Sequence, residues 1–161
     1  MPIKIPNLKK KDYPYKLLLE GNVDVHAQLY LIVETFKDEH LSYKHPEVKS
    51  RTIGELISHT LCTQRCYFTD SLVLEKKEKC ECKIPTNVKE ALEMIQENLD
   101  QITKIWSKIP MKELEKEFKA EWGQVMTKEL ALFVSIEHYM YHVGEICFIA
   151  GMGGFYQGTL G

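Results

Sequence analysis

An apolar seam runs along the segment between Thr86 and Pro110. Its members lie alternately three and four residues apart, which is the spacing that places them on one face of an α-helix: Val88, Leu92, Ile95, Leu99, Ile102, Trp106 and Ile109. A helix with so regular a seam has to bury it against other helices. The sequence therefore predicts a helix from just after Thr86 to near Pro110, packed within a larger helical core.

Three further segments have helical periodicity and cover most of the remaining chain. They run from about Pro14 to Asp38, from about Ile53 to Lys76 and from about Thr127 to Ala150. The second segment follows Thr52 and contains Glu55, which together fit the S/T-x-x-E capping box. These features predict three more long helices.

The polar stretch from Met111 to Gln124 separates the last two predicted helices. We expect it to hold a short helix or a loop. No run of residues alternates with period two for long enough to indicate a sheet. We therefore predict an all-α protein, a four-helix bundle formed by a single domain over residues 1–161.

The composition excludes several classes of protein. Of 161 residues, 44% are hydrophobic and 27% are charged, as in a globular rather than a disordered chain. A net charge of −2 excludes a nucleic-acid binder that depends on bulk positive charge. The apolar runs are too short for a membrane span or for the core of a signal peptide. We expect a cytoplasmic protein with neither nucleic-acid nor membrane partners.

The chain has five cysteines, an odd number that follows no regular disulfide framework. In a reducing compartment such cysteines are expected to be free thiols. Cys80 and Cys82 form a Cys-x-Cys pair in a charged linker, and we find no second ligand pair at the spacing of a zinc site. We interpret Cys66 and Cys147 as small apolar filling residues.

The sharpest local feature is the pair His138 and His142. Residues four apart on a helix share a face, with Cβ atoms about 5–6 Å apart, so the two imidazoles can chelate one metal ion. His59 lies in the middle of the second predicted helix. Cys62 lies on nearly the same side and is either a fourth ligand or a small apolar filling residue. Either these imidazoles bond to neighbouring backbone or carboxylate groups, or they bind a metal from the bundle interior. His26, beside an apolar stripe, is interpreted as a partnered core residue.

Two segments resemble signatures of the DinB/YfiT-like superfamily. Thr52-Ile-Gly-Glu-Leu-Ile-Ser-His59 is similar to the signature of that family's second helix, and Ile136-Glu-His138-Tyr-Met-Tyr-His142-Val-Gly-Glu145 to that of its fourth. The loop Glu121-Trp122-Gly123 and the order of the four helices also match, so the resemblance covers nearly the whole chain. It implies an up-down-down-up topology, a homodimer, and one divalent metal bound by His59, His138 and His142.

The resemblance also implies a type of chemistry. Characterised members include transferases and isomerases that use low-molecular-weight thiols such as bacillithiol or mycothiol. Three neutral imidazoles leave a metal with an open position, where water or a thiol loses its proton near neutral pH. Zinc, nickel and iron all accept imidazole. We therefore expect a metal-dependent transferase or hydrolase, with a non-enzymatic metal- or ligand-binding stress-response bundle as the alternative.

Two carboxylates are candidates for acid or base catalysis by their placement, Glu55 and Glu145. Glu145 stands where the family often has glutamine. It lies three residues beyond His142, so we expect it to be a hydrogen-bond partner of that imidazole or a weak fourth ligand.

The homodimer is expected to use the outer faces of the second and fourth long helices. If the histidines point into the bundle, the apolar side chains opposite them point away from the metal. These are Ile57, Leu61, Phe68 and Leu72 on one helix, and Phe133, Ile136, Met140 and Cys147 on the other. An exposed apolar stripe of this size usually marks an interface. If the other two helices cover the stripe instead, the chain is a monomer.

Overall fold

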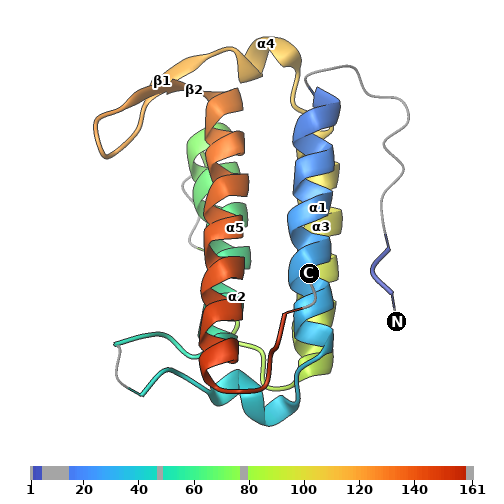
Figure 1. Ribbon diagram of the computed structural model, residues 1–161. Coiled ribbons are helices and arrows are strands. Elements are labelled where there is room, and N and C mark those ends of the chain that lie inside the picture. Colours follow the sequence, from blue (N-terminus) through green and yellow to red (C-terminus); the bar gives the residue numbers. More distant parts are fainter. Residues whose placement is uncertain (1, 5–14, 47–48, 77–79, 159–161) are drawn as a thin grey trace.

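Four long helical segments form a bundle in the computed structural model, which describes residues 2–4, 15–46, 49–76 and 80–158 (Figure 1). They are α1 (Tyr15–Glu34), α2 (Ile53–Cys62) with its continuation η2 (Thr63–Val73), α3 (Val88–Trp106) and α5 (Lys128–Met152). The predicted all-α four-helix bundle is confirmed. Within the described residues, no helix is long and apolar enough to cross a bilayer.

The helices follow the up-down-down-up order that the sequence resemblance implied (Figure 1). The first helix, α1, packs against α3 and α5, while α2 and η2 pack against α5 and, less extensively, against α3. Because α2 and α3 run in the same direction, the chain between them has to travel back along the bundle. This crossover contains Cys80 and Cys82.

The predicted seam of α3 forms much of the core. Ile95, Leu99, Ile102 and Trp106 are all at most 1% exposed. Ile95 belongs to one apolar cluster of the bundle interior, and Ile102 and Trp106 belong to a second. The Trp106 indole N–H donates to the Thr69 hydroxyl at 2.9 Å, so this buried ring also has a partner for its polar atom. Burial of the seam thus joins α3 to η2 and to α1.

Side-chain caps explain where the helices begin. The Thr52 hydroxyl accepts from the Glu55 amide at 3.2 Å, and the Glu55 carboxylate accepts from the Thr52 amide at 2.7 Å. The predicted capping box is therefore confirmed. Thr127 caps α5 by accepting from the Leu130 amide at 3.1 Å, and Asn87 caps α3.

Two helix boundaries differ from the prediction. The first helix ends at Glu34, and Asp38 instead begins a separate 3-10 helix, η1 (Asp38–Ser42). The predicted start near Pro14 lies outside the described residues. The last helix extends to Met152, two residues beyond the predicted end.

A small sheet was not predicted. After the short helix α4 (Met111–Leu114), the strands β1 (Glu117–Lys119) and β2 (Val125–Thr127) form an antiparallel hairpin in which Phe118 faces Met126. Strands of three residues are too short to show a period-two pattern. The turn between them contains Gly123, whose φ of 91° favours glycine.

The second long helix changes its hydrogen-bonding pattern partway. From Thr63 to Val73 it is a π-helix rather than an α-helix, and at its end the Leu74 amide donates to the carbonyl of Thr69, five residues earlier. At the start of this change, the side-chain amide of Asn98 on α3 donates to the Leu61 carbonyl at 3.2 Å. The predicted continuous α-helix to Lys76 is therefore wrong in this half.

Candidate metal centre

Three histidines from two antiparallel helices converge on one point. His59 comes from α2, and His138 and His142 come from successive turns of α5. The ring centroids of His138 and His142 are 4.5 Å apart, and that of His59 lies 4.7 Å from His142 and 5.6 Å from His138. One nitrogen of each ring lies within 4.8 Å of the others. The structure thus brings together the three residues that the sequence singled out.

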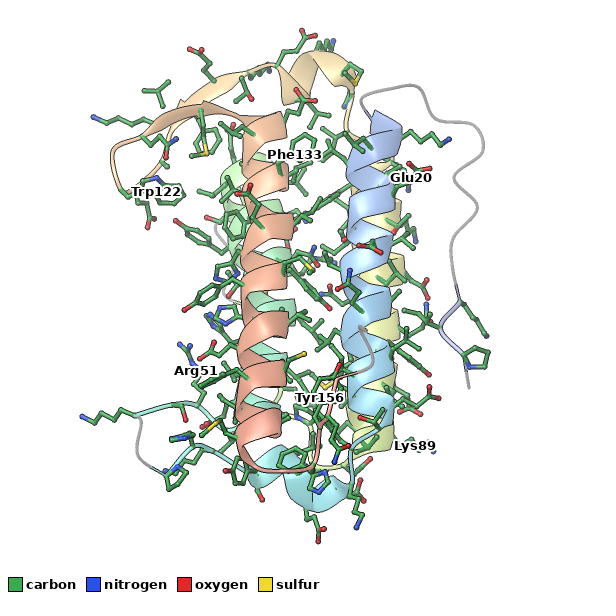
Figure 2. The ribbon with its side chains drawn as sticks, in the orientation of Figure 1. Glu20, Arg51, Lys89, Trp122, Phe133 and Tyr156 are labelled. Carbon is green, nitrogen blue, oxygen red and sulfur yellow. A yellow bond between two sulfur atoms is a disulfide. The ribbon has the colours of Figure 1, made fainter. Side chains whose placement is uncertain are left out.

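The centre lies at the outer contact of α2 and α5, not in the bundle interior as expected. His59 and His138 are partly exposed, whereas His142 is buried. His59 lines a cavity of about 430 Å³ together with Arg51 and Tyr67. Figure 2 shows Arg51 and Trp122 on the side of α5 that faces away from α1. A centre in this position is reached from solvent without opening the bundle.

Another histidine occupies the interior. His26 is fully buried, with its Nδ1 2.7 Å from the Asn22 carbonyl oxygen and its Nε2 2.8 Å from the Asn98 side-chain oxygen. Burial lowers the pKa of His26 to about 4, against the opposing effect of these two hydrogen bonds. The interpretation of His26 as a partnered core residue is confirmed.

The geometry of the α5 pair suits a shared ion. The Nε2 atoms of His138 and His142 are 3.2 Å apart. Two imidazoles on a tetrahedral ion, with metal–nitrogen bonds of 2.0–2.1 Å, hold their nitrogens about 3.4 Å apart. On the other side of its ring, His142 Nδ1 donates to the Glu145 carboxylate at 2.8 Å. That hydrogen bond leaves the Nε2 lone pair directed towards His138.

Burial and neighbouring charges favour the neutral forms of His138 and His59. Burial, with smaller contributions from the neighbouring His142 and His59, lowers the pKa of His138 to about 4. Burial also lowers the pKa of His59, with smaller contributions from Arg51 and His142. Neutral imidazoles are the form that binds metals. Among the described residues, the buried Nδ1 of His138 has no hydrogen-bond partner.

Neighbouring side chains hold the three rings. The Thr63 hydroxyl lies 3.4 Å from Nδ1 of His59, the ring of Phe68 lies 5.6 Å from that of His138, and the ring of Tyr141 lies 5.1 Å from that of His142. With three convergent ring nitrogens and neighbouring side chains against each ring, the residues present fit one divalent metal ion.

The two candidate carboxylates differ in their surroundings. Glu145 bonds to His142, as expected for a residue that orients a ligand. Glu55 lines the same cavity as His59, but its carboxylate is engaged in the cap of α2, and the hydrogen bond from the Thr52 amide lowers its pKa. A carboxylate with a lowered pKa is a weak base, so this geometry disfavours Glu55 as a general base.

The cysteines depart from the expected pattern. The structure pairs Cys62 with Cys82 and Cys66 with Cys80, and leaves Cys147 as a free thiol. Cys147 thus stands apart, as expected, whereas the other four sulfurs gather in one cluster. The inference that Cys80-x-Cys82 lacks a second pair is wrong, because Cys62-x-x-x-Cys66 supplies it. The four-residue spacing of that second pair on a helix was the missed signal.

The expected exposed stripes are not exposed. Ile57, Leu61, Phe68 and Leu72 are at most 9% exposed, and the four apolar residues predicted to lie beside them on α5 are partly buried. His59 and His138 are partly exposed, and the apolar residues expected to lie opposite them pack into the protein. The argument that these stripes form a dimer interface is therefore wrong, while the dimer itself stays a prediction.

The chain is similar to one characterised family and to several solved structures. The model of the DinB family matches residues 8–155. YfiT from Bacillus subtilis, described as a probable metal-dependent hydrolase with an unusual four-helix bundle topology, has 16% sequence identity and a TM-score of 0.69. That match covers 94% of each chain. No match was found among curated proteins.

Two further structures have the same fold. A DinB-like protein from Bacillus subtilis has 16% identity and a TM-score of 0.67, over 86% of this chain and 92% of that one. A DinB-like protein from Bacillus cereus has 19% identity and a TM-score of 0.61, over 85% and 91% of the respective chains. Identities this low support the likeness of fold alone.

Proposed function

Because the chain belongs to the DinB family, we propose that it is a metal-dependent hydrolase or transferase whose divalent metal is held by His59, His138 and His142. The observation that carries the proposal is the convergence of three imidazole nitrogens within 4.8 Å of one another. The description of the structurally similar YfiT as a probable metal-dependent hydrolase adds support. A purely structural role for the histidines does not explain why three imidazole nitrogens converge on one point.

Each residue of the centre has a distinct task. The three imidazoles hold the ion, and Glu145 fixes the tautomer of His142 and increases its basicity. Phe68 and Tyr141 limit the rotation of the rings beside them. When bound, a zinc, nickel or iron ion on three neutral ligands supplies a positive charge that acidifies an incoming water or low-molecular-weight thiol.

The cavity beside His59 is the proposed substrate site. It has a volume of about 430 Å³ and is lined by the guanidinium of Arg51, the ring of Tyr67 and the aliphatic side chain of Ile84. A guanidinium recognises carboxylate and phosphate groups through paired hydrogen bonds. We therefore infer that the substrate is a small molecule that carries an anionic group and an apolar part.

Elemental analysis of tag-free protein, together with a hydrolase and thiol-transfer activity panel, tests the proposal. The His138→Ala variant should lose one equivalent of divalent metal and any metal-dependent activity, because two remaining ligands bind much more weakly. His40→Ala is the matched control, since His40 belongs to η1 and not to the centre. It should retain both properties.

Unchanged metal content in His138→Ala would overturn the proposed ligand set. If His138→Ala loses the metal but the wild-type protein shows no metal-dependent activity, the result would instead support the non-enzymatic alternative. Chelation followed by separate additions of zinc, nickel and iron would identify which ion restores activity.

A further inference from the structure

Four cysteine sulfurs gather at a second location, beside the histidine centre. Cys62 and Cys66 lie on the second long helix, and Cys80 and Cys82 lie in the crossover that follows it. All four sulfurs lie within 4.8 Å of one another. Two separate disulfides require only that each sulfur meets one partner. Here, every sulfur is near all three others.

The spacing between the pairs matches a mononuclear tetrahedral site. Cys62 Sγ is 3.8 Å from Cys66 Sγ and 3.9 Å from Cys80 Sγ, although neither is its disulfide partner. Four thiolates at zinc–sulfur distances of about 2.3 Å form a tetrahedron with edges of about 3.8 Å. A cluster with several irons holds its outermost cysteine sulfurs farther apart, so these positions suit a single ion.

The local backbone aligns each pair. Cys62 and Cys66 are four residues apart on a continuous helical segment, and therefore share a face. Cys80 and Cys82 are two residues apart in a segment without helix or turn, and alternate residues of an extended chain lie on the same side. Each pair thus presents two sulfurs in the same direction, as a chelating pair does.

The four cysteines share one cavity of about 480 Å³. Arg65 and Lys76 also line it, and both contact Asp70, at 2.8 Å and 2.9 Å respectively. Metal binding itself takes cysteines in their thiolate form. Soft thiolate ligands in a tetrahedral arrangement select zinc or iron.

We propose that Cys62, Cys66, Cys80 and Cys82 bind one tetrahedral metal ion of the zinc type as thiolates, at a structural site separate from the three-histidine centre. Binding displaces four thiol protons and transfers no electrons. The ion attaches the crossover to the helix and so fixes a wall of the cavity that His59 also lines. With four protein ligands, the site has no open position for substrate.

Cobalt substitution and metal counting test this inference. We would purify tag-free protein anaerobically, without chelator, and then exchange its metal for Co²⁺. A four-thiolate site gives intense visible absorption and a thiolate-to-cobalt charge-transfer band in the near ultraviolet, whereas an imidazole site lacks that band. The Cys80→Ser/Cys82→Ser variant should lose the band and one metal equivalent. Cys147→Ser, the matched control at the cysteine outside the cluster, should keep both.

The outcome is independent of the histidine centre. His138→Ala should keep the charge-transfer band even if it loses its own metal, so failure of one site is distinguishable from failure of the other. A wild-type protein without the band, with an intact mass lower by one hydrogen for each of the four cysteines, would overturn the inference and establish two disulfides instead. This measurement needs no variant, so a folding defect in the serine variant does not affect it.

Discussion

Glu145 contacts a proposed metal ligand directly, because its carboxylate accepts a hydrogen bond from His142 at 2.8 Å. A carboxylate accepts a stronger hydrogen bond from an imidazole N–H than an amide oxygen does. We predict that Glu145→Gln keeps the metal but weakens its affinity, by about tenfold or more, because partners behind a ligand typically contribute 10–100-fold. Competition with a chelating dye measures this change.

The matched control is Glu137→Gln on the exposed side of the same helix. It removes the same charge from α5 without touching an imidazole. Equal metal affinities for the two variants would show that Glu145 acts only through its charge. A Glu145→Gln variant with the metal affinity of the wild-type protein would show that Glu145 has no role at the site.

His26 makes stability depend on pH. Its pKa in the folded protein is about 4, below the ordinary value near 6.5, so the unfolded chain binds the proton more tightly. Folding stability is therefore full above pH 6.5 and is lost as the pH falls towards 4. For this single group, the loss amounts to about 3 kcal/mol. Denaturant unfolding of metal-free protein at several pH values measures it.

A His26→Gln variant, which cannot take up a proton, should show a shallower fall in the free energy of unfolding over the same pH range. His40→Gln, at a histidine outside the core, should retain the steep dependence of the wild-type protein. Parallel curves for the wild-type and His26→Gln proteins would contradict the assignment of this slope to His26.

At the scale of secondary structure, the helices were predictable because their signals are local. The seam of α3 and the capping box at Thr52 each depend on residues within a few positions of one another. The hairpin and the π-helix depend on contacts that no local pattern encodes. The Asn98 side chain, which bonds to the Leu61 carbonyl where the π-helix begins, comes from another helix altogether.

The candidate centre shows the same division. The spacing of His138 and His142 predicted a chelating pair, and the family resemblance supplied His59. The direction in which these side chains point was wrong in the sequence interpretation, because apolar and polar faces of α5 are not cleanly separated. Tyr139, His142 and Val143 are all buried, so periodicity alone did not identify the face that packs inward. The cluster of four cysteines was not predictable from local patterns, because it forms only where the crossover folds back beside the second long helix.

At the scale of the whole molecule, a homodimer stays a prediction but needs another surface. Tyr141, Phe148 and Met152 are exposed on α5, and the side chain of Phe148 is 63% exposed. These three residues lie seven and four positions apart, so they share one side of the helix. We predict that Phe148→Asp converts a dimer into a folded monomer. Phe68→Asp, at a side chain that is 4% exposed, should instead unfold the protein.

Sedimentation equilibrium and circular dichroism separate these outcomes. A wild-type monomer would contradict the dimer itself, and a Phe148→Asp dimer would exclude this face as its interface. A stably folded Phe68→Asp protein would contradict the burial of that ring.

The histidine centre joins a helix from the first half of the chain to one from the second half, so it does not exist until both have docked. Metal binding therefore has little to act on during the early steps of folding. Its stabilisation falls almost entirely on the native side of the barrier, where it slows unfolding without accelerating folding. An occupied centre thus lengthens the lifetime of the native state. Where proteolysis is limited by the rate of unfolding, a bound ion protects the chain by slowing unfolding and not by speeding folding.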